Sequence, residues 1–180
     1  MNITESHFLK ALSNYPKDIE KVIENLNHSL SSDYRHAPSL CLMGKVFAQE
    51  IKDYSLAEHY FKKALKADYN YAETHINYVK LLLIFGNVEL MEKQIELSKH
   101  IVGVNLCELY LLKAKSSEMH RDFNQALQTI EMALTLSCTE EIDKELEEFK
   151  KRIYRKMKSN IVAQNRDEVS LYRWLKTYSY

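Results

Sequence analysis

The chain has 180 residues, of which 46% are hydrophobic and 28% charged, a composition typical of a globular protein with a substantial core. Gly occurs 3 times and Pro twice, too few for a turn-rich β architecture, so helices joined by tight connections are expected. The 25 basic and 25 acidic residues give a formal net charge of zero. This balance disfavours nucleic acid and anionic membranes as partners.

The N-terminal residues 1–10 lack the basic start and apolar run of a secretory signal. The longest apolar run, Leu81 to Phe85, is far shorter than a membrane span. We therefore expect a cytoplasmic protein with no membrane partner.

Cysteine and histidine are placed in a way that argues against metal binding. Cys41, Cys107 and Cys138 are odd in number, widely spaced and without a CxxC motif, which disfavours a disulfide framework and a zinc site. The 7 histidines include no HExxH pair. We expect three buried free thiols, no metal and no cofactor.

No catalytic motif stands out. The three glycines are isolated, so no glycine-rich phosphate loop is present, and there is no GxSxG sequence. These observations predict a protein that is not an enzyme.

The N-terminal segment predicts a pair of helices. Apolar residues recur at helical spacing from Ile19 to Leu30, and residues 3–13 form a short partner helix. The sequence Tyr15-Pro16-Lys17 supplies the turn between them. We interpret residues 1–34 as a diverged version of the repeat that follows.

A repeat of 34 to 35 residues follows. Asp53, Asn87 and Asp122 recur at this spacing, and each suits a helix N-cap because its side-chain oxygen accepts from a free backbone N–H group. Small residues recur before and after these caps, where one helix closely approaches another. Each unit is therefore two antiparallel helices, with boundaries at 37–68, 71–101 and 104–136.

These residues resemble the tetratricopeptide repeat (TPR) pattern of small and aromatic positions. The residues that fit it are Gly44, Phe47, Ala57, Phe61 and Ala64, then Tyr110, Ala114, Phe123, Ala126 and Ala133. The resemblance covers about residues 37 to 136 and implies an all-α, right-handed antiparallel helix-pair solenoid. The middle unit departs from the pattern with Val79, Met91 and Ser98, and the first unit carries one extra residue near Glu50.

A long helix is predicted over 139–164, with an apolar face that begins at Ile142 and Leu146 and covers the last repeat as a capping helix. After a break near Asn165, residues 166–180 form an aromatic tail, expected as a short helix. One interpretation is that the acidic first half and basic second half of the helix stabilise it through the helix dipole, and that the tail folds back onto it. The alternative is that the helix and the tail form a second interface. That interface would comprise Lys151, Arg155, Tyr172, Trp174 and Tyr178.

In the TPR family, the first helices of the units line a concave face. Lys45, Lys80 and Lys115 recur there at a spacing of 35 residues, each one turn from an apolar residue. This predicts a groove for an acidic and apolar peptide, although ordinary solvated lysines would share the spacing. The groove comprises Lys45, Ile76, Asn77, Lys80, Leu83, Ile84, Leu111, Lys115 and Met119.

The predicted function is a scaffold or adaptor that binds a protein segment in this groove. A dedicated chaperone of a secreted or assembled partner is a close alternative. Alternatives of another class are nucleic-acid contact, or self-association of two copies, through the basic end of the capping helix and the tail. Some proteins with this fold hold the C-terminal carboxylate of a partner between an asparagine and basic residues. Asn77 matches the asparagine, but Glu108 of the next unit stands where a basic residue is needed, so we do not expect this role.

Overall fold

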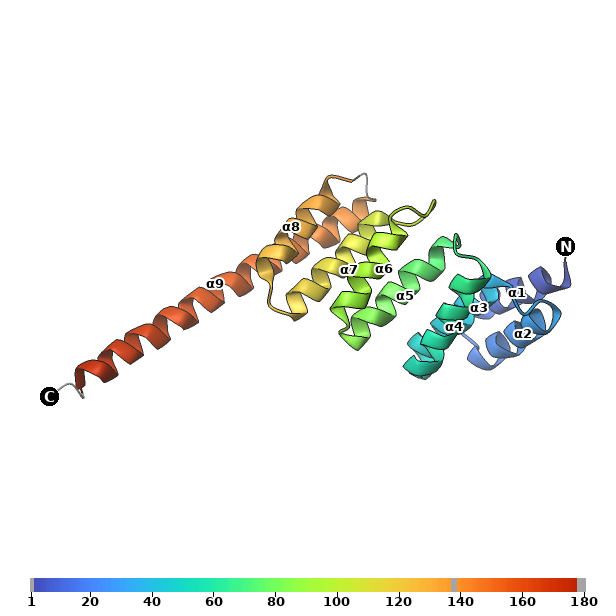
Figure 1. The fold of residues 1–180 in the computed structure, drawn as a ribbon, viewed down its shortest axis with the longest axis horizontal. Coiled ribbons are helices and arrows are strands. Elements are labelled where there is room, and N and C mark those ends of the chain that lie inside the picture. The colour runs from blue at the N-terminus through green and yellow to red at the C-terminus, as the bar shows by residue number, and fades with distance from the viewer. Residues whose placement is uncertain (1, 137–138, 178–180) are drawn as a thin grey trace. The chain divides into compact units, whose positions relative to one another are not determined.

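The computed structural model describes residues 2–136 and 139–177, with side chains up to residue 159. Within those ranges the chain is helical and contains no strand (Figure 1). The helices are α1 (Ile3–Asn14), α2 (Ile19–Ser32), α3 (Ala37–Val46), the π-helical turn η1 (Phe47–Ile51), α4 (Tyr54–Ala67), α5 (Ala72–Phe85), α6 (Val88–Ser98), α7 (Leu106–Met119), α8 (Phe123–Leu134) and α9 (Glu140–Thr177).

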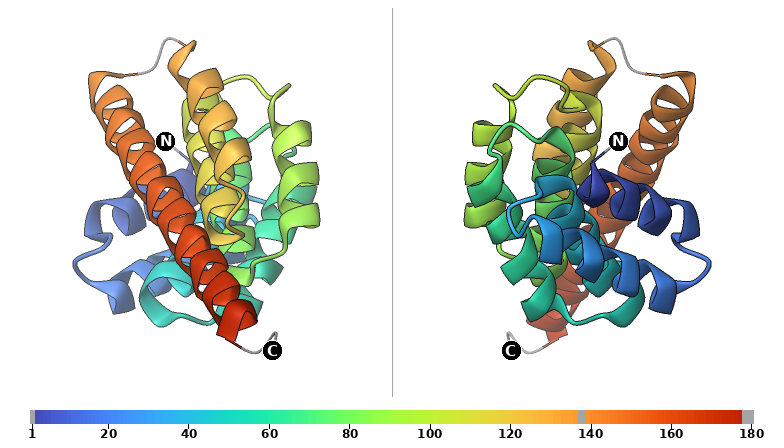
Figure 2. Two further views of the ribbon diagram at one scale, coloured as in Figure 1. Left: turned by 90° about the vertical axis from the view of Figure 1, so that its left-hand side faces the viewer. Right: turned by 90° about the vertical axis from the view of Figure 1, so that its right-hand side faces the viewer.

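The chain divides into two compact units, Met1–Leu112 and Lys113–Tyr180. In the first unit, consecutive helices pack as pairs: α1 with α2, α3 with α4, and α5 with α6. Successive pairs join where α2 meets α3 and where α4 and α3 both meet α5, so the first helices of adjacent pairs are neighbours (Figure 2). In the second unit, α8 packs against α9.

The predicted N-caps are confirmed. The carboxylates of Asp53 and Asp122 and the amide oxygen of Asn87 each accept a hydrogen bond, at 2.9 to 3.0 Å, from the backbone N–H three residues later. These bonds satisfy donors that the first helical turn leaves unpaired. They fix where α4, α6 and α8 begin.

The residue before each of these caps has left-handed backbone geometry. The φ angle is 66° at Lys52, 66° at Gly86 and 61° at Arg121. Only Gly86 adopts this conformation without steric cost, because a Cβ atom crowds the following carbonyl oxygen. A Cβ added at Gly86 would meet no atom within 4 Å, so its cost there is conformational.

Opposite effects on stability are expected from two substitutions in these turns. Gly86→Ala should lower the free energy of unfolding by about 1 kcal/mol, because alanine pays the left-handed penalty. Lys52→Gly should leave it unchanged or raise it by up to about 1 kcal/mol, because glycine removes that penalty. Urea denaturation measures both, and equal destabilisation by the two substitutions would contradict this account.

The extra residue of the first repeat unit is absorbed by a π-helical turn. From Gly44 to the cap Asp53 there are nine positions, whereas the equivalent residues Val79 and Asn87 are eight apart. The turn η1, at Phe47–Ile51, accommodates the additional residue at the end of α3 without breaking the helix. The cap and the small-residue contact therefore both keep their places.

Gly44 sets the separation of α3 and α4. A Cβ atom built on Gly44 would lie 2.7 Å from both Cδ1 and Cε1 of the Phe61 ring. Phe61 is only 1% exposed, so its ring is enclosed by neighbouring atoms. The two helices are therefore as close as a glycine allows.

The sign of a Gly44→Ala substitution should depend on residue 61. In the native chain the overpacking cost, about 1 to 3 kcal/mol, exceeds the gain in helix propensity of about 1 kcal/mol, so stability should fall. In a Phe61→Ile background the clash is removed and Gly44→Ala should be neutral or stabilising. Thermal and urea unfolding of the four proteins measure this, and a stabilising Gly44→Ala in the native background would refute the packing argument. As a control, Ala114→Gly, at the equivalent position of α7, should lower the free energy of unfolding by about 1 kcal/mol.

Helix α9 covers α8 with the predicted apolar face, where Leu146, Phe149 and Ile153 are buried. The predicted break near Asn165 is wrong, because α9 continues as one helix to Thr177. No Gly or Pro occurs between Glu140 and Thr177, and an asparagine within a helix costs only about 0.7 kcal/mol or less.

The expectation for the thiols needs a correction. Cys41 is a buried free cysteine, and burial raises the pKa of its thiol to about 11, so it stays protonated. Cys107 is disulfide-bonded, so the expectation of a free thiol is wrong there. Cys138 lies outside the described residues.

Candidate protein-binding face

The three recurring lysines of the first helices are not free cations. Each forms an ion pair with a glutamate of a later helix, so each recurring lysine has an acid beside it instead of contributing a free positive charge. The first two pairs lie in the first unit and the third in the second unit. They are Lys45–Glu73 (3.8 Å), Lys80–Glu108 (2.6 Å) and Lys115–Glu145 (2.9 Å).

The positions of these glutamates explain the pairing. Glu73 and Glu108 occupy the first turns of α5 and α7, where a negative charge is also favoured by the helix dipole. Lys45 lies in the last turn of α3, where a positive charge is favoured for the same reason. Each pair stays partly in water, as the 38% and 31% exposure of the Lys80 and Glu108 side chains shows.

Two apolar residues of the predicted groove are accessible. Ile84, in the first unit, is 52% exposed, and Met119, in the second, is 60% exposed. Each lies four residues, or about one helical turn, after the lysine of its own helix. Ile76 and Leu83 are half-buried.

Two other predicted groove residues point into the protein. Leu111 is buried, and so is Asn77, whose amide donates a hydrogen bond to the sulfur of Cys41 at 3.6 Å. Asn77 thus serves packing between α5 and α3. These two side chains offer a partner little surface.

Tyr15 is a neighbour of the face that sequence reasoning missed. Its ring lies under the Lys45 ammonium at 5.2 Å, and its hydroxyl donates to Gln49 at 2.6 Å and to Glu50 at 3.2 Å. Burial and the nearby Glu50 carboxylate raise the pKa of Tyr15 to about 12, so it remains a hydrogen-bond donor at neutral pH. The Glu73 and Glu108 partners were detectable, since they recur 28 residues after their lysines.

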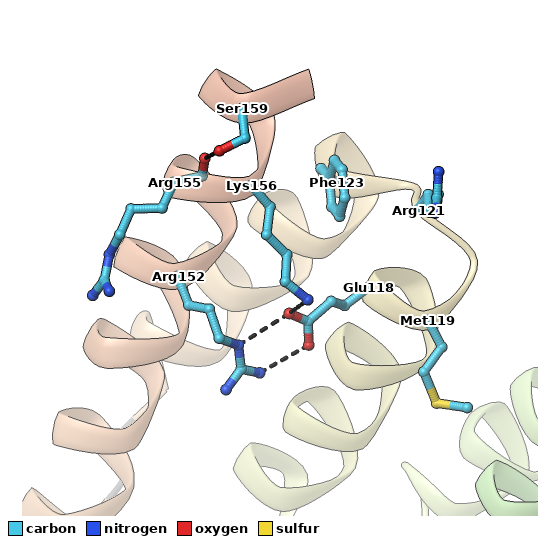
Figure 3. Close-up of a pocket in the computed structure, with 8 residues that line it drawn as sticks. All are labelled: Glu118, Met119, Arg121, Phe123, Arg152, Arg155, Lys156 and Ser159. Atoms are coloured by element: carbon cyan, nitrogen blue, oxygen red, sulfur yellow. Dashed lines mark hydrogen bonds and ion pairs between the residues drawn. The ribbon is translucent and has the colours of Figure 1, made fainter. Parts of the chain in front are cut away.

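In the second unit, Glu118 fastens α7 to α9 (Figure 3). Arg152 donates two hydrogen bonds to its carboxylate, at 3.0 and 2.8 Å, and the Lys156 ammonium lies 2.8 Å away. Burial raises the pKa of Glu118, but the hydrogen bonds and charges of both cations outweigh burial and hold the pKa below its usual range. These contacts lie in a pocket of about 550 Å³ that Met119 and Phe123 also line.

The residues of the predicted second interface are not brought together by any described contact. Lys151 forms an ion pair with Glu148 at 2.8 Å, whereas Arg155 is exposed beside the Glu118 pocket. Three aromatic side chains of that prediction lie outside the described residues: Tyr172, Trp174 and Tyr178. The second interface stays a prediction.

The Lys80–Glu108 pair should couple measurably because it joins two different helices. A double-mutant cycle of Lys80→Met and Glu108→Gln should give a coupling of about 0.5 to 1 kcal/mol in low salt that declines at 1 M salt. Urea denaturation provides the four free energies. A cycle on the exposed pair Lys144–Glu140 within α9 is the control and should give less. Zero coupling at low salt would show that the observed pair contributes no stability.

No protein-family model and no curated protein matches this sequence. Solved TPR-type structures do match in shape. PilF of Pseudomonas aeruginosa aligns over 91% of this chain and 72% of its own, at 18% identity and a TM-score of 0.75. PilW, a widely conserved type IV pilus biogenesis factor, aligns over 75% of this chain at 16% identity and a TM-score of 0.68, and the chain spans 62% of PilW.

MamA from Desulfovibrio magneticus RS-1 aligns over 100% of this chain and 99% of its own, at 15% identity and a TM-score of 0.66. The predicted all-α helix-pair solenoid with a capping helix is therefore confirmed. At these identities the likeness extends to the fold alone.

Among residues 2–136 and 139–177, no helix is long and apolar enough to cross a membrane. Among the described side chains, which end at residue 159, no group of three or more His, Cys, Asp or Glu is placed to hold a metal ion.

Proposed function

We propose that this protein is a scaffold that acts by binding a segment of another protein, rather than by catalysis. The supporting observation is the ion pair that each recurring lysine forms with a glutamate of a later helix. An exposed apolar residue follows one turn after Lys80 and after Lys115. Partly exposed ion pairs confer register and specificity on an interface, and the apolar side chains Ile84 and Met119 supply area to bury.

The pairing changes the expected partner. A segment recognised here carries both signs of charge with an apolar residue between them, because each lysine already has a glutamate beside it. A purely acidic segment would be attracted by the lysines and repelled by the glutamates at similar distances. The accessible residues of the predicted groove remain the proposed contacts, with Ile84 and Lys80 foremost in the first unit, and the partner Glu108 of Lys80 joins them.

The chaperone role and the cytoplasmic location stay predictions. Nothing in the described geometry favours a chaperone over another scaffold. The disulfide at Cys107 runs against the cytoplasm, since cytosolic thiols are normally kept reduced.

The first-helix face is tested by exchanging the charges of one pair. Twelve-residue peptides are first selected on the native protein from a phage-displayed random library. They should bind a Lys80→Glu/Glu108→Lys variant at least about tenfold more weakly, because the positive and negative side chains that they contact have exchanged positions. The exchange retains an ion pair, so the free energy of unfolding should change by less than about 1 kcal/mol. Fluorescence anisotropy of the synthetic peptides and urea denaturation give the two numbers.

The matched control exchanges an exposed pair within α9, as Lys144→Glu/Glu140→Lys, and also leaves the net charge unchanged. Selected peptides should bind this control as they bind the native protein. Equal binding to the Lys80/Glu108 exchange, or a library that yields no binder, would rule out this face as the site.

A further inference from the structure

Two adjoining hollows lie on the first unit between α2 and α4, away from the first-helix lysines. Their volumes are about 360 and 400 Å³, and they share Tyr34, Leu40 and Lys63 as lining. Tyr34 comes from the connection that follows α2, Leu40 from α3 and Lys63 from α4. We call this pair of hollows the α2–α4 hollow.

Three cations line the α2–α4 hollow and no acidic residue does. They are Arg35, Lys63 and Lys66. Within the described part of the chain, none of the three forms an ion pair, whereas Lys62, the next residue along α4, pairs with Glu58 at 2.8 Å.

The acids nearest in sequence are occupied elsewhere. Asp33 accepts the backbone N–H of Arg35 at 2.9 Å, and Asp68 accepts that of Asn70 at 2.9 Å. Both carboxylates order the backbone at the ends of α2 and α4. The hollow is therefore lined by three cations that form no ion pair with a described residue, in a chain whose formal net charge is zero.

The same hollow exposes apolar surface. Tyr34 is 79% exposed beside Leu40, which is buried. The Lys63 ammonium lies 5.8 Å from the ring centroid of Tyr60, which also stacks on the Phe47 ring at 5.5 Å. Exposed tyrosine and arginine side chains around a pocket are the residue types that dominate protein-binding hot spots.

We propose that the α2–α4 hollow binds an acidic segment of a protein that carries an aromatic or aliphatic side chain. Carboxylates of the segment neutralise Arg35, Lys63 and Lys66, and the apolar side chain packs on Tyr34. The three cations surround one hollow instead of following a strip, and a series of exposed aromatics for stacking bases is missing from its lining, so a peptide fits better than a nucleic-acid strand.

The Glu118 pocket of the second unit shows the contrast. It is also rich in cations, but Arg152 and Lys156 are engaged by the Glu118 carboxylate (Figure 3). Those two cations hold α9 to α7. The three cations of the α2–α4 hollow form no such ion pair with any described residue.

The proposal is tested with a fluorescein-labelled ten-residue peptide of glutamates around one central tryptophan. Fluorescence anisotropy should show binding that weakens with added salt. A Lys63→Glu/Lys66→Glu variant should bind at least about tenfold more weakly, since two attractions become repulsions. Tyr34→Ala should weaken binding about threefold or more, and replacing the glutamates of the peptide by glutamine should abolish it.

The matched control is Lys10→Glu/Lys17→Glu, which makes the same change in net charge on α1 and the turn after it. It should bind within about twofold of the native protein, because separation and salt screen its charges. The Lys80→Glu/Glu108→Lys protein should also bind normally, which separates this proposal from the first-helix face. A Lys63→Gln/Lys66→Gln variant repeats the test if the glutamate variant loses helical circular dichroism.

Several results would overturn the proposal. One is that the native protein fails to bind the peptide, and another is that it binds the glutamine peptide as tightly as the glutamate peptide. A third is that the Lys63→Glu/Lys66→Glu variant and the Lys10→Glu/Lys17→Glu control weaken binding equally. Tighter binding of a ten-nucleotide single-stranded DNA through Lys63 and Lys66 would also overturn it, and would assign the hollow to phosphate.

Discussion

The close approach of the two helices within a pair is the constraint from which the remaining geometry follows. At α3 and α4 the approach is limited by a single contact, the edge of the Phe61 ring on the backbone of Gly44. The equivalent buried residues are Val79 and Ile95 in the next pair and Ala114 and Ile130 in the third. The largest ring thus faces the smallest residue, Gly44, and isoleucine takes its place where the first helix carries a side chain, as a close-packed interior requires.

This constraint also decides which faces are left for function. When the apolar stripes of α3 to α6 are buried against one another, the first helices of adjacent pairs lie side by side and place Lys80 opposite the first turn of α7. The Lys–Glu pairs are a consequence of that spacing. A repeat with a wider separation between helices would leave the same residues too far apart to pair.

The sequence predicts the fold well, because the signals that specify it are local. The caps Asp53, Asn87 and Asp122 and the small residues recur at one spacing, and the surplus position near Glu50 corresponds to the π-helical turn η1. The predicted break near Asn165 is the exception among these local signals. It failed because an asparagine costs a helix far less than a proline does.

Ser98 departs from the repeat pattern because its hydroxyl belongs to a buried hydrogen-bond network, which cannot be seen from its position in the repeat. Its hydroxyl donates to the backbone carbonyl of Gln94 at 2.6 Å, and it lies 3.1 Å from Nδ1 of the fully buried His75. Nε2 of that histidine donates to the carbonyl of Tyr69 at 2.6 Å, so Nδ1 is left as an acceptor, and the Gln94 amide donates to it at 2.9 Å. An alanine at position 98, usual in the repeat, would leave this buried network with one partner fewer.

The candidate site was predictable in position but not in charge, and the reason is the range of the interactions. Helical register places Lys45, Lys80 and Lys115 at equivalent positions of their helices, yet each partner belongs to a later helix. The 28-residue spacing of Glu73 and Glu108 marks them as candidates, but only the packing of the helices brings the charges together. Net charge is a sum over the chain and does not distinguish a paired lysine from an unpaired one. Lys62 and Lys63 are adjacent in sequence, but the first is neutralised by Glu58 one turn earlier and the second faces the α2–α4 hollow. Sites of this kind are therefore located by identifying the partner of each charge, because an unpaired charge attracts another molecule more strongly than a paired one does.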